Sequence, residues 1–157
     1  MRIRIYTDGA CSDNPGPGGW AIVVNTSDGC IQYTGRSTST TNNRMEMSAM
    51  LRALQYIAEE GNVTDVYEIY CDSAYVVNAI NNSWLTKWKL GGWKTKTGDE
   101  VKNKDLWLQI SDYIRSINRM DYQLVIYKVK GHAGDPLNEL VDRLAKAETQ
   151  EAKARCE

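Results

Sequence analysis

A helical pattern lies between two groups of strand patterns, and this order limits the folds that are open to the chain. The segment from Asn42 to Gly61 repeats apolar side chains at helical spacing, with Asn42 and Asn43 expected as its caps. The apolar run from Val66 to Cys71 follows and predicts a strand. A strand, a crossover helix and a second strand favour parallel pairing in a layered α/β fold.

The rest of the chain supplies further strands and helices. Before the helix, turn residues separate three short strand patterns that predict a meander: 2–6, 20–24 and 30–33. After Val66 to Cys71 we expect a helical segment, a last strand and a last helix: 75–80, 122–129 and 137–147. A chain of 157 residues is long enough for one domain with a substantial core, so we expect a single domain over residues 1–157, with 149–157 as a frayed tail.

Composition excludes several classes of protein. The chain has no apolar run of transmembrane length, and its first residues lack the apolar core of a signal peptide, so we expect a cytoplasmic protein. The four cysteines show no CxxC spacing and only one histidine accompanies them, which argues against a zinc site and favours reduced thiols. The net charge is -1, so any nucleic-acid surface must be local.

Four motifs of the chain carry acids that stand out: Asp8, Glu46, Asp72 and Asp142. Three of the four stand where strand or helix patterning brings them together at one edge of the sheet. Each has a structural explanation of its own, as a turn residue, a cap or a surface helix acid. Together they form a set that repels itself unless a hard cation binds among them. The four acids therefore suggest Mg²⁺ chemistry at a crevice beside the strand ends.

His132 is the only histidine and lies in the glycine-flanked loop GHAGDPLN, before the last helix. A loop histidine is equally compatible with a solvated side chain and with proton transfer near a metal site around neutral pH. The sequence alone leaves these two interpretations open.

The segment from Trp84 to Lys104 combines tryptophans with six lysines against Asp99 and Glu100, a balance of +4 in a chain of net charge -1. A charged run is often only a solvated face. Exposed tryptophan without a partner is unfavourable, however, and aromatic plus basic side chains suit contacts with bases, sugars and phosphates. We therefore favour nucleic-acid contact here, with Trp107 in the helical stretch that follows expected in the core.

Six ordered motifs carry a family resemblance: TDGACSDNPGPGG, TTNNRMEM, YCDSAYVV, WLTKWKLGGWKT, KNKDLW and GHAGDPLNELVDRLA. In this order they resemble type 1 ribonuclease H, in the compact bacterial or phage-like form without an added hybrid-binding domain. The resemblance implies an α/β fold, ribonuclease H-like, with a five-stranded mixed sheet flanked by helices. It also implies an endonuclease that cleaves the RNA strand of RNA/DNA hybrids and acts as a monomer without an obligate protein partner.

The resemblance further assigns roles to individual residues. It implies two Mg²⁺ ions, with Mn²⁺ as an alternative, bound by the four carboxylates Asp8, Glu46, Asp72 and Asp142. It implies that His132 is a mobile residue that assists proton transfer and product departure. Two metal ions of this kind activate a water and stabilise the leaving 3′ oxygen, which gives 5′-phosphate and 3′-hydroxyl ends.

Substrate contacts follow from the same motif match. Three asparagines match minor-groove contacts, where an amide can recognise the 2′-hydroxyl: Asn14, Asn42 and Asn43. Two residues match a pocket for a phosphate of the DNA strand: Thr41 and Asn103. The basic protrusion beside that strand matches Trp84, Trp88, Lys87, Lys89 and Lys94.

The sequence also departs from the family pattern. Ala74 stands where many relatives carry glutamine, and Ser39 stands where an arginine often assists the phosphate pocket. These differences concern affinity for the hybrid rather than the reaction. Two alternative functions are a non-catalytic hybrid-binding module and a junction resolvase or integrase core. The complete set of acids argues against the first, and TNNRME together with the Trp/Lys segment argues against the second.

Overall fold

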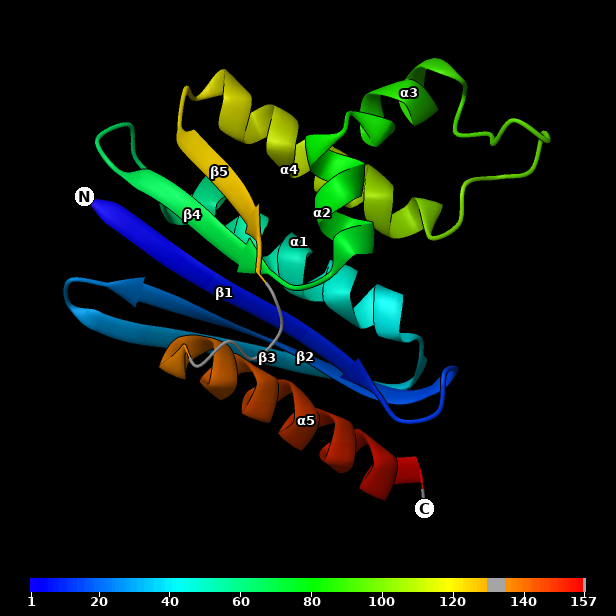
Figure 1. Cartoon of the computed structure of the whole chain (residues 1–157), viewed down its shortest axis with the longest axis horizontal. Helices are drawn as coiled ribbons and strands as arrows, with labels where there is room; N and C mark the ends of the chain where they lie inside the picture. The colour runs from blue at the N-terminus through cyan, green and yellow to red at the C-terminus, as the bar shows by residue number, and fades with distance from the viewer. Residues whose placement is uncertain (130–134, 157) are drawn as a thin grey trace.

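A five-stranded mixed sheet forms the centre of the protein in the computed structural model, which describes residues 1–129 and 135–156 (Figure 1). The strands lie in the order β3-β2-β1-β4-β5. Their bounds are β1 (Arg2–Cys11), β2 (Gly16–Thr26), β3 (Gly29–Thr40), β4 (Val66–Cys71) and β5 (Gln123–Lys128). The first three strands pair antiparallel, whereas β4 pairs parallel with both β1 and β5. The predicted fold and the predicted parallel pairing are both confirmed.

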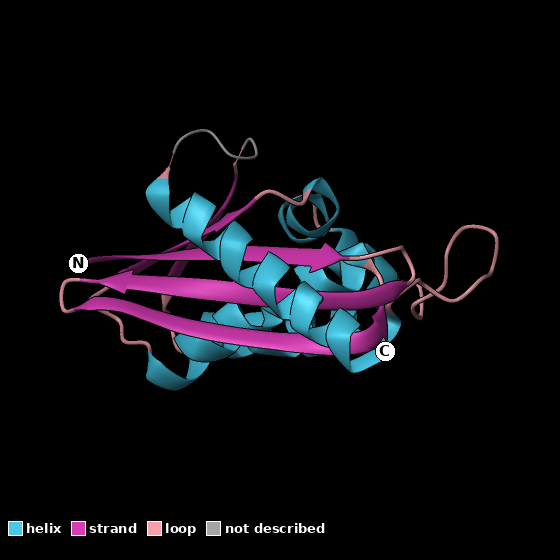
Figure 2. Ribbon diagram, turned by 90° about the horizontal axis from the view of Figure 1, so that it is seen from below, coloured by secondary structure: helices cyan, strands magenta, loops and turns pink. Residues whose placement is uncertain are grey.

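The helices cover the two faces of the sheet unequally (Figure 2). They are α1 (Asn42–Glu60), α2 (Ala74–Asn81), α3 (Trp84–Leu90), α4 (Lys104–Arg119) and α5 (Pro136–Cys156). Helix α1 packs against β1 and β2 on one face, and α5 packs against β1, β2 and β3 on the other. Figure 1 shows α5 along the half of the sheet that β1, β2 and β3 form, away from β5.

Alternation along β1 explains why helices lie on both faces. Ile3 and Ile5 belong to the larger core, which the apolar stripe of α1 completes, and Tyr6 belongs to the smaller core beneath α5. The predicted apolar positions Met47, Met50 and Leu54 are fully buried in the larger core. Trp107 of α4 is also fully buried, as expected.

Two of the expected element boundaries are wrong. The N-cap of α1 is Thr41 rather than Asn42 or Asn43, because the Thr41 side chain accepts a hydrogen bond from the Arg44 amide. The last helix does not end near residue 147 with a frayed tail from residue 149, because it continues to Cys156. Thr149 and Ala152 are buried in the part of α5 that packs on the sheet, which stabilises these additional turns.

The strands of the meander are longer than the apolar pattern predicted. Gly18 and Gly19 belong to β2 rather than to a loop, and α5 lies directly above Gly19. A Cβ atom at Gly19 would lie 2.5 Å from the Glu148 Cβ atom and 2.7 Å from the Thr149 amide nitrogen. Glycine at this position therefore allows close packing of α5 on the sheet. No helix in the described part of the chain is long and apolar enough to cross a membrane.

Candidate active site

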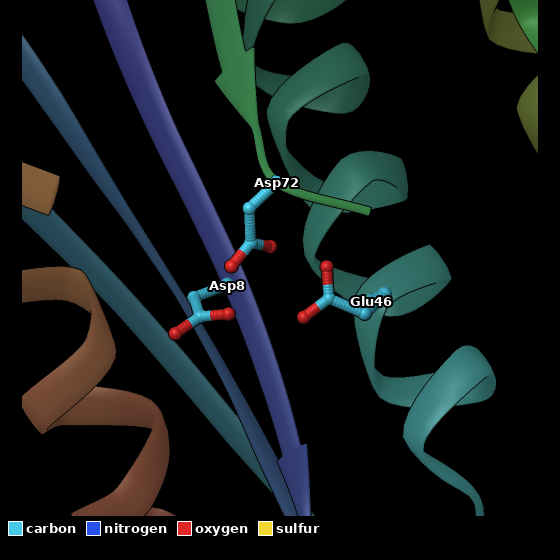
Figure 3. A group of neighbouring side chains, drawn as sticks. All are labelled: Asp8, Glu46 and Asp72. Carbon is cyan, nitrogen blue, oxygen red and sulfur yellow. The ribbon is translucent and has the colours of Figure 1, made fainter. Parts of the chain in front are cut away.

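Strand register brings two of the predicted acids side by side. Thr7 of β1 pairs with Cys71, the last residue of β4, so the next residues are Asp8 on β1 and Asp72 just beyond the end of the adjacent parallel strand. Glu46 reaches the same place from the start of α1 (Figure 3). One carboxylate oxygen from each of the three residues lies within 4.8 Å of the others. Three acids from separate parts of the sequence thus face one small volume.

Gly9 holds two of these carboxylates with a single amide. Its N–H donates to Asp8 Oδ1 at 2.9 Å and to Glu46 Oε1 at 2.7 Å. A Cβ atom at this position would lie 2.4 Å from the Glu46 amide nitrogen and 2.4 Å from the Met45 carbonyl carbon. Because no side chain separates them, α1 lies directly on β1 and Glu46 reaches the end of the sheet.

Burial and mutual repulsion favour the protonated forms of Asp8 and Glu46 by raising the pKa of each. Burial raises the pKa of Asp8 to about 7, with Asp72 and Asp142 adding to the increase and a hydrogen bond with Glu46 opposing it. Burial also raises the pKa of Glu46, and the negative charges of Asp72 and Asp8 raise it further. A donor set made only of carboxylate oxygens fits a hard divalent cation, which would take the place of these protons.

The fourth acid comes from the opposite face of the sheet. Asp142 of α5 lines one open pocket together with Asp8, Glu46 and Asp72. The Nζ atom of Lys146, one turn further along α5, lies 3.0 Å from Asp142 Oδ2. The structure therefore brings all four predicted acids to one pocket, from within β1, from the end of β4 and from two helices.

The predicted minor-groove asparagines lie beside this pocket. Asn14, Asn42 and Asn43 are exposed, and Asn42 lines the pocket itself. The Asn42 amide donates to Asn14 Oδ1 at 2.8 Å, which connects the β1–β2 turn to the start of α1. Ala74, the position that departs from the family pattern, is exposed at the start of α2.

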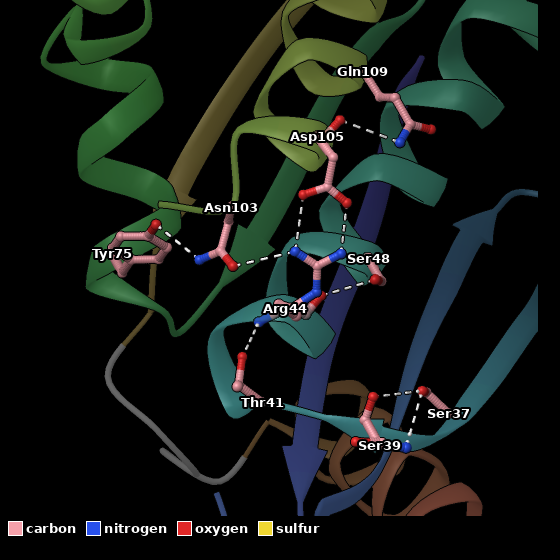
Figure 4. Close-up of polar contacts among 9 residues, drawn as sticks. All are labelled: Ser37, Ser39, Thr41, Arg44, Ser48, Tyr75, Asn103, Asp105 and Gln109. Carbon is pink, nitrogen blue, oxygen red and sulfur yellow. Dashed lines mark hydrogen bonds and ion pairs between the residues drawn. The ribbon is translucent and has the colours of Figure 1, made fainter. Parts of the chain in front are cut away.

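Arg44 links the two residues of the predicted phosphate pocket (Figure 4). Its amide donates to Thr41 Oγ1 at 3.2 Å, and its Nη1 donates to Asn103 Oδ1 at 3.2 Å. The same guanidinium forms a two-pronged ion pair with Asp105, with N–O distances of 2.9 and 2.6 Å. Asn103 in turn donates from Nδ2 to the Tyr75 hydroxyl at 3.2 Å. Thr41 and Asn103 are thus held in one network, although they are distant in sequence.

Sequence reasoning missed the roles of Arg44 and Asp105 in this network. Both lie inside motifs that carry the resemblance, TTNNRMEM and KNKDLW. An arginine and an aspartate in two such motifs were the available signal for a link between them. The exposed Ser39 contributes no positive charge here, and its amide donates to Ser37 Oγ at 3.3 Å.

The tryptophans of the Trp/Lys segment pack against one another. The ring centroid of Trp88 lies 6.1 Å from Trp84, 6.4 Å from Trp93 and 5.7 Å from the buried Trp107. These rings are therefore partnered within the protein, which weakens the argument that they require an external ligand. The lysines at positions 87, 89 and 94 are exposed and remain available for contact. His132 lies outside the described residues.

Comparisons with known proteins agree with this fold and site. A model of the family described as RNase H matches residues 1–150. Ribonuclease H of Caldicellulosiruptor saccharolyticus is 42% identical over 151 residues, covering 96% of this chain and 98% of the relative. Ribonuclease H of Syntrophomonas wolfei is 44% identical over 144 residues, covering 92% and 93%.

Solved structures show the same architecture. LC9-RNase H1, described as a type 1 RNase H with the type 2 active-site motif, superposes with a TM-score of 0.76 at 25% identity, covering 96% of this chain and 73% of that one. LC11-RNase H1 in complex with an RNA/DNA hybrid superposes with a TM-score of 0.69 at 23% identity, covering 96% and 98%. The fold and the sequence relatives together define an enzyme of the hydrolase class. The chain belongs to the ribonuclease H family, whose members use divalent metal ions to degrade RNA in RNA/DNA hybrids.

Proposed function

We propose that the chain is an endonuclease that hydrolyses the RNA strand of RNA/DNA hybrids and leaves 5′-phosphate and 3′-hydroxyl ends. The observation that carries the proposal is the convergence of Asp8, Glu46 and Asp72 within 4.8 Å, with Asp142 lining the same pocket. Four carboxylates placed together have no structural purpose that a neutral side chain could not serve at lower electrostatic cost. A non-catalytic binding module would not require them.

The four carboxylates would hold two Mg²⁺ or Mn²⁺ ions. When bound, these ions supply an activated water and stabilisation of the leaving 3′ oxygen. Gly9 fixes Asp8 and Glu46 relative to each other through its amide. His132, which lies outside the described residues, is proposed to move a proton and to assist product departure.

Strand choice would come from the residues around the pocket. Exposed Asn14, Asn42 and Asn43 lie where their amides can contact the 2′-hydroxyls of the RNA strand. Thr41 and Asn103, joined by Arg44, would hold a phosphate of the DNA strand. On the protrusion, Lys87, Lys89 and Lys94 would contact that strand directly, and Trp84 and Trp88 would support them from inside.

One assay separates this function from its alternatives. The protein is incubated with labelled RNA/DNA hybrid, RNA duplex, DNA duplex and a four-way junction, each with Mg²⁺ or EDTA. We expect cleavage of the hybrid alone, only with Mg²⁺. Asp72→Asn should abolish cleavage, whereas Asp28→Asn, a matched change of an exposed acid in the β2–β3 turn, should not. Binding without cleavage would support a non-catalytic module, and cleavage of the junction would support a resolvase.

A further inference from the structure

Helix α5 is attached to β1 on both sides of Asp8. Two residues before Asp8, the Tyr6 hydroxyl donates to Asp135 Oδ2 at 2.9 Å. Two residues after Asp8, the Ala10 carbonyl oxygen lies 3.4 Å from the Thr149 hydroxyl. Each contact joins the strand that carries Asp8 to the helix that carries Asp142.

Asp142 lies midway between these two contacts. It lies seven positions after Asp135 and seven positions before Thr149. At a rise of about 1.5 Å per residue, each contact is roughly 10 Å along the helix axis from Asp142. The two contacts therefore bracket Asp142 on the helix as they bracket Asp8 on the strand.

The two contacts differ in kind. The contact between Thr149 and Ala10 is supported by backbone packing, because α5 lies so close to Gly19 that no side chain fits between them. The contact between Tyr6 and Asp135 is a hydrogen bond between side chains, and its carboxylate acceptor makes it strong. A single substitution can remove it.

Asp135 caps the start of α5 and also accepts the hydrogen bond from the Tyr6 hydroxyl. Its Oδ1 accepts a hydrogen bond from the Leu137 amide at 3.0 Å, and its carbonyl oxygen accepts one from the Glu139 amide at 3.0 Å. The aspartate thus caps the first turn of the helix while its other carboxylate oxygen binds Tyr6. Displacing Asp135 would move the whole first turn of α5.

Tyr6 is held firmly enough to serve as a fixed point. Its side chain is buried, and its ring stacks on Tyr70 with centroids 5.0 Å apart and planes 16° apart. Tyr70 stacks in turn on Tyr127 at 5.3 Å. This row of rings crosses β1, β4 and β5 on the face of the sheet that carries α5, so the Tyr6 hydroxyl has little freedom to move.

We propose that Tyr6 is a positioning residue, whose hydrogen bond to Asp135 sets the height of α5 so that Asp142 stands opposite Asp8 at the distance that a shared metal ion requires. This inference rests on the proposed function for the role of the metal. A merely structural role would lower the free energy of unfolding and leave metal affinity unchanged. Loss of the Tyr6 hydroxyl should instead weaken metal binding.

The test compares Tyr6→Phe with Tyr70→Phe. Tyr70 stands two residues before Asp72 as Tyr6 stands two before Asp8, and its hydroxyl donates to Glu68 on its own strand rather than to α5. Each variant loses one hydroxyl and keeps its ring in the stack. Mn²⁺ affinity is measured by calorimetric titration, unfolding by urea, and hybrid cleavage as a function of Mg²⁺ concentration.

We expect Tyr6→Phe to weaken Mn²⁺ binding by about tenfold or more, as is typical when a residue that orients a metal ligand is lost. The Mg²⁺ concentration for half-maximal cleavage should rise by a similar factor, and excess Mg²⁺ should restore most of the rate. Tyr70→Phe should bind Mn²⁺ as the unaltered protein does, with a comparable change in stability. Equal Mn²⁺ affinities of the two variants would overturn the proposal.

A double-mutant cycle tests the route through Asp135. Asp135→Ala removes the acceptor together with the helix cap, so adding Tyr6→Phe should then weaken Mn²⁺ binding no further. An undiminished effect of Tyr6→Phe in that background would also overturn the proposal. Failure of the proposed function would look different, because the unaltered protein would then bind Mn²⁺ without cleaving any hybrid.

Discussion

Replacing Asp8 with asparagine should stabilise the metal-free protein while abolishing cleavage. The Asp8 side chain is buried among Glu46, Asp72 and Asp142, so its negative charge is both desolvated and repelled. Asparagine has nearly the same shape and can still accept the Gly9 amide through Oδ1. The substitution therefore removes a charge with little change in packing.

The size of the effect follows from the pKa of Asp8, which rises from 3.8 to about 7. An acid with a raised pKa in the folded state imposes no penalty below its unfolded pKa; the penalty grows as pH rises from the unfolded to the folded value and is complete above the folded value. Three pKa units at about 1.4 kcal/mol each set an upper bound of about 4 kcal/mol above neutral pH. We expect Asp8→Asn to raise the free energy of unfolding by about 2–4 kcal/mol near pH 8 and by less than half of that near pH 5.

The assay is urea unfolding followed by far-ultraviolet dichroism in EDTA at both pH values. Asp28→Asn serves as the control for loss of an exposed acid and should change stability little at either pH. Added Mg²⁺ should stabilise the unaltered protein more than Asp8→Asn, which narrows the difference between them. The electrostatic reasoning fails if Asp8→Asn is less stable than the unaltered protein near pH 8 in EDTA, or if its advantage is the same at both pH values.

Three further predictions concern the surroundings of the acids. Gly9→Ala should force α1 away from β1 and displace Glu46, so calorimetry should show Mn²⁺ binding lost or weakened by about 100-fold. Retained Mn²⁺ affinity would contradict the close approach of α1 at this glycine. Replacing both Lys87 and Lys89 with glutamine should lower the slope of log Kd against log salt for the hybrid by about 1 to 2, and an unchanged slope would exclude phosphate contact by these side chains. Ser39→Arg should supply the positive charge missing from the predicted phosphate pocket and tighten hybrid binding by about three- to tenfold, as measured by fluorescence anisotropy in EDTA. Unchanged affinity would mean that the DNA strand lies elsewhere.

Sequence patterns predicted the short parallel strands β4 and β5 better than the three longer strands of the meander. Val66 to Cys71 was predicted with its observed bounds, because β4 lies between two strands and its apolar run ends sharply at Asp72. The third strand runs from Gly29 to Thr40, whereas the pattern indicated only residues 30–33. Its second half, GRSTST, carries only glycine and polar side chains at the edge of the sheet, so no apolar alternation marks it.

The acids of the candidate site were found because their motifs are local, whereas the contacts that position them are not. Gly9 and Glu46 stand in separate motifs, and only the packing of α1 on β1 shows that one amide serves both Asp8 and Glu46. The Tyr6–Asp135 hydrogen bond likewise joins residues 129 positions apart, and hydrophobic periodicity carries no information about contacts at that separation. The same limit applies to the tryptophans of the Trp/Lys segment, which were predicted to contact nucleic acid and which pack against one another in the structure.

The tryptophan cluster gives this protein a built-in optical signal. The indole rings of Trp84, Trp93 and Trp107 lie at centroid distances of 5.7 to 6.4 Å from the ring of Trp88, close enough for their electronic transitions to couple with it. Because Trp107 belongs to α4 and Trp88 to α3, the coupling between these two rings exists only while the two helices are packed together. Exciton dichroism in the ultraviolet therefore distinguishes release of the lysine-bearing protrusion from unfolding of the sheet, without any added label.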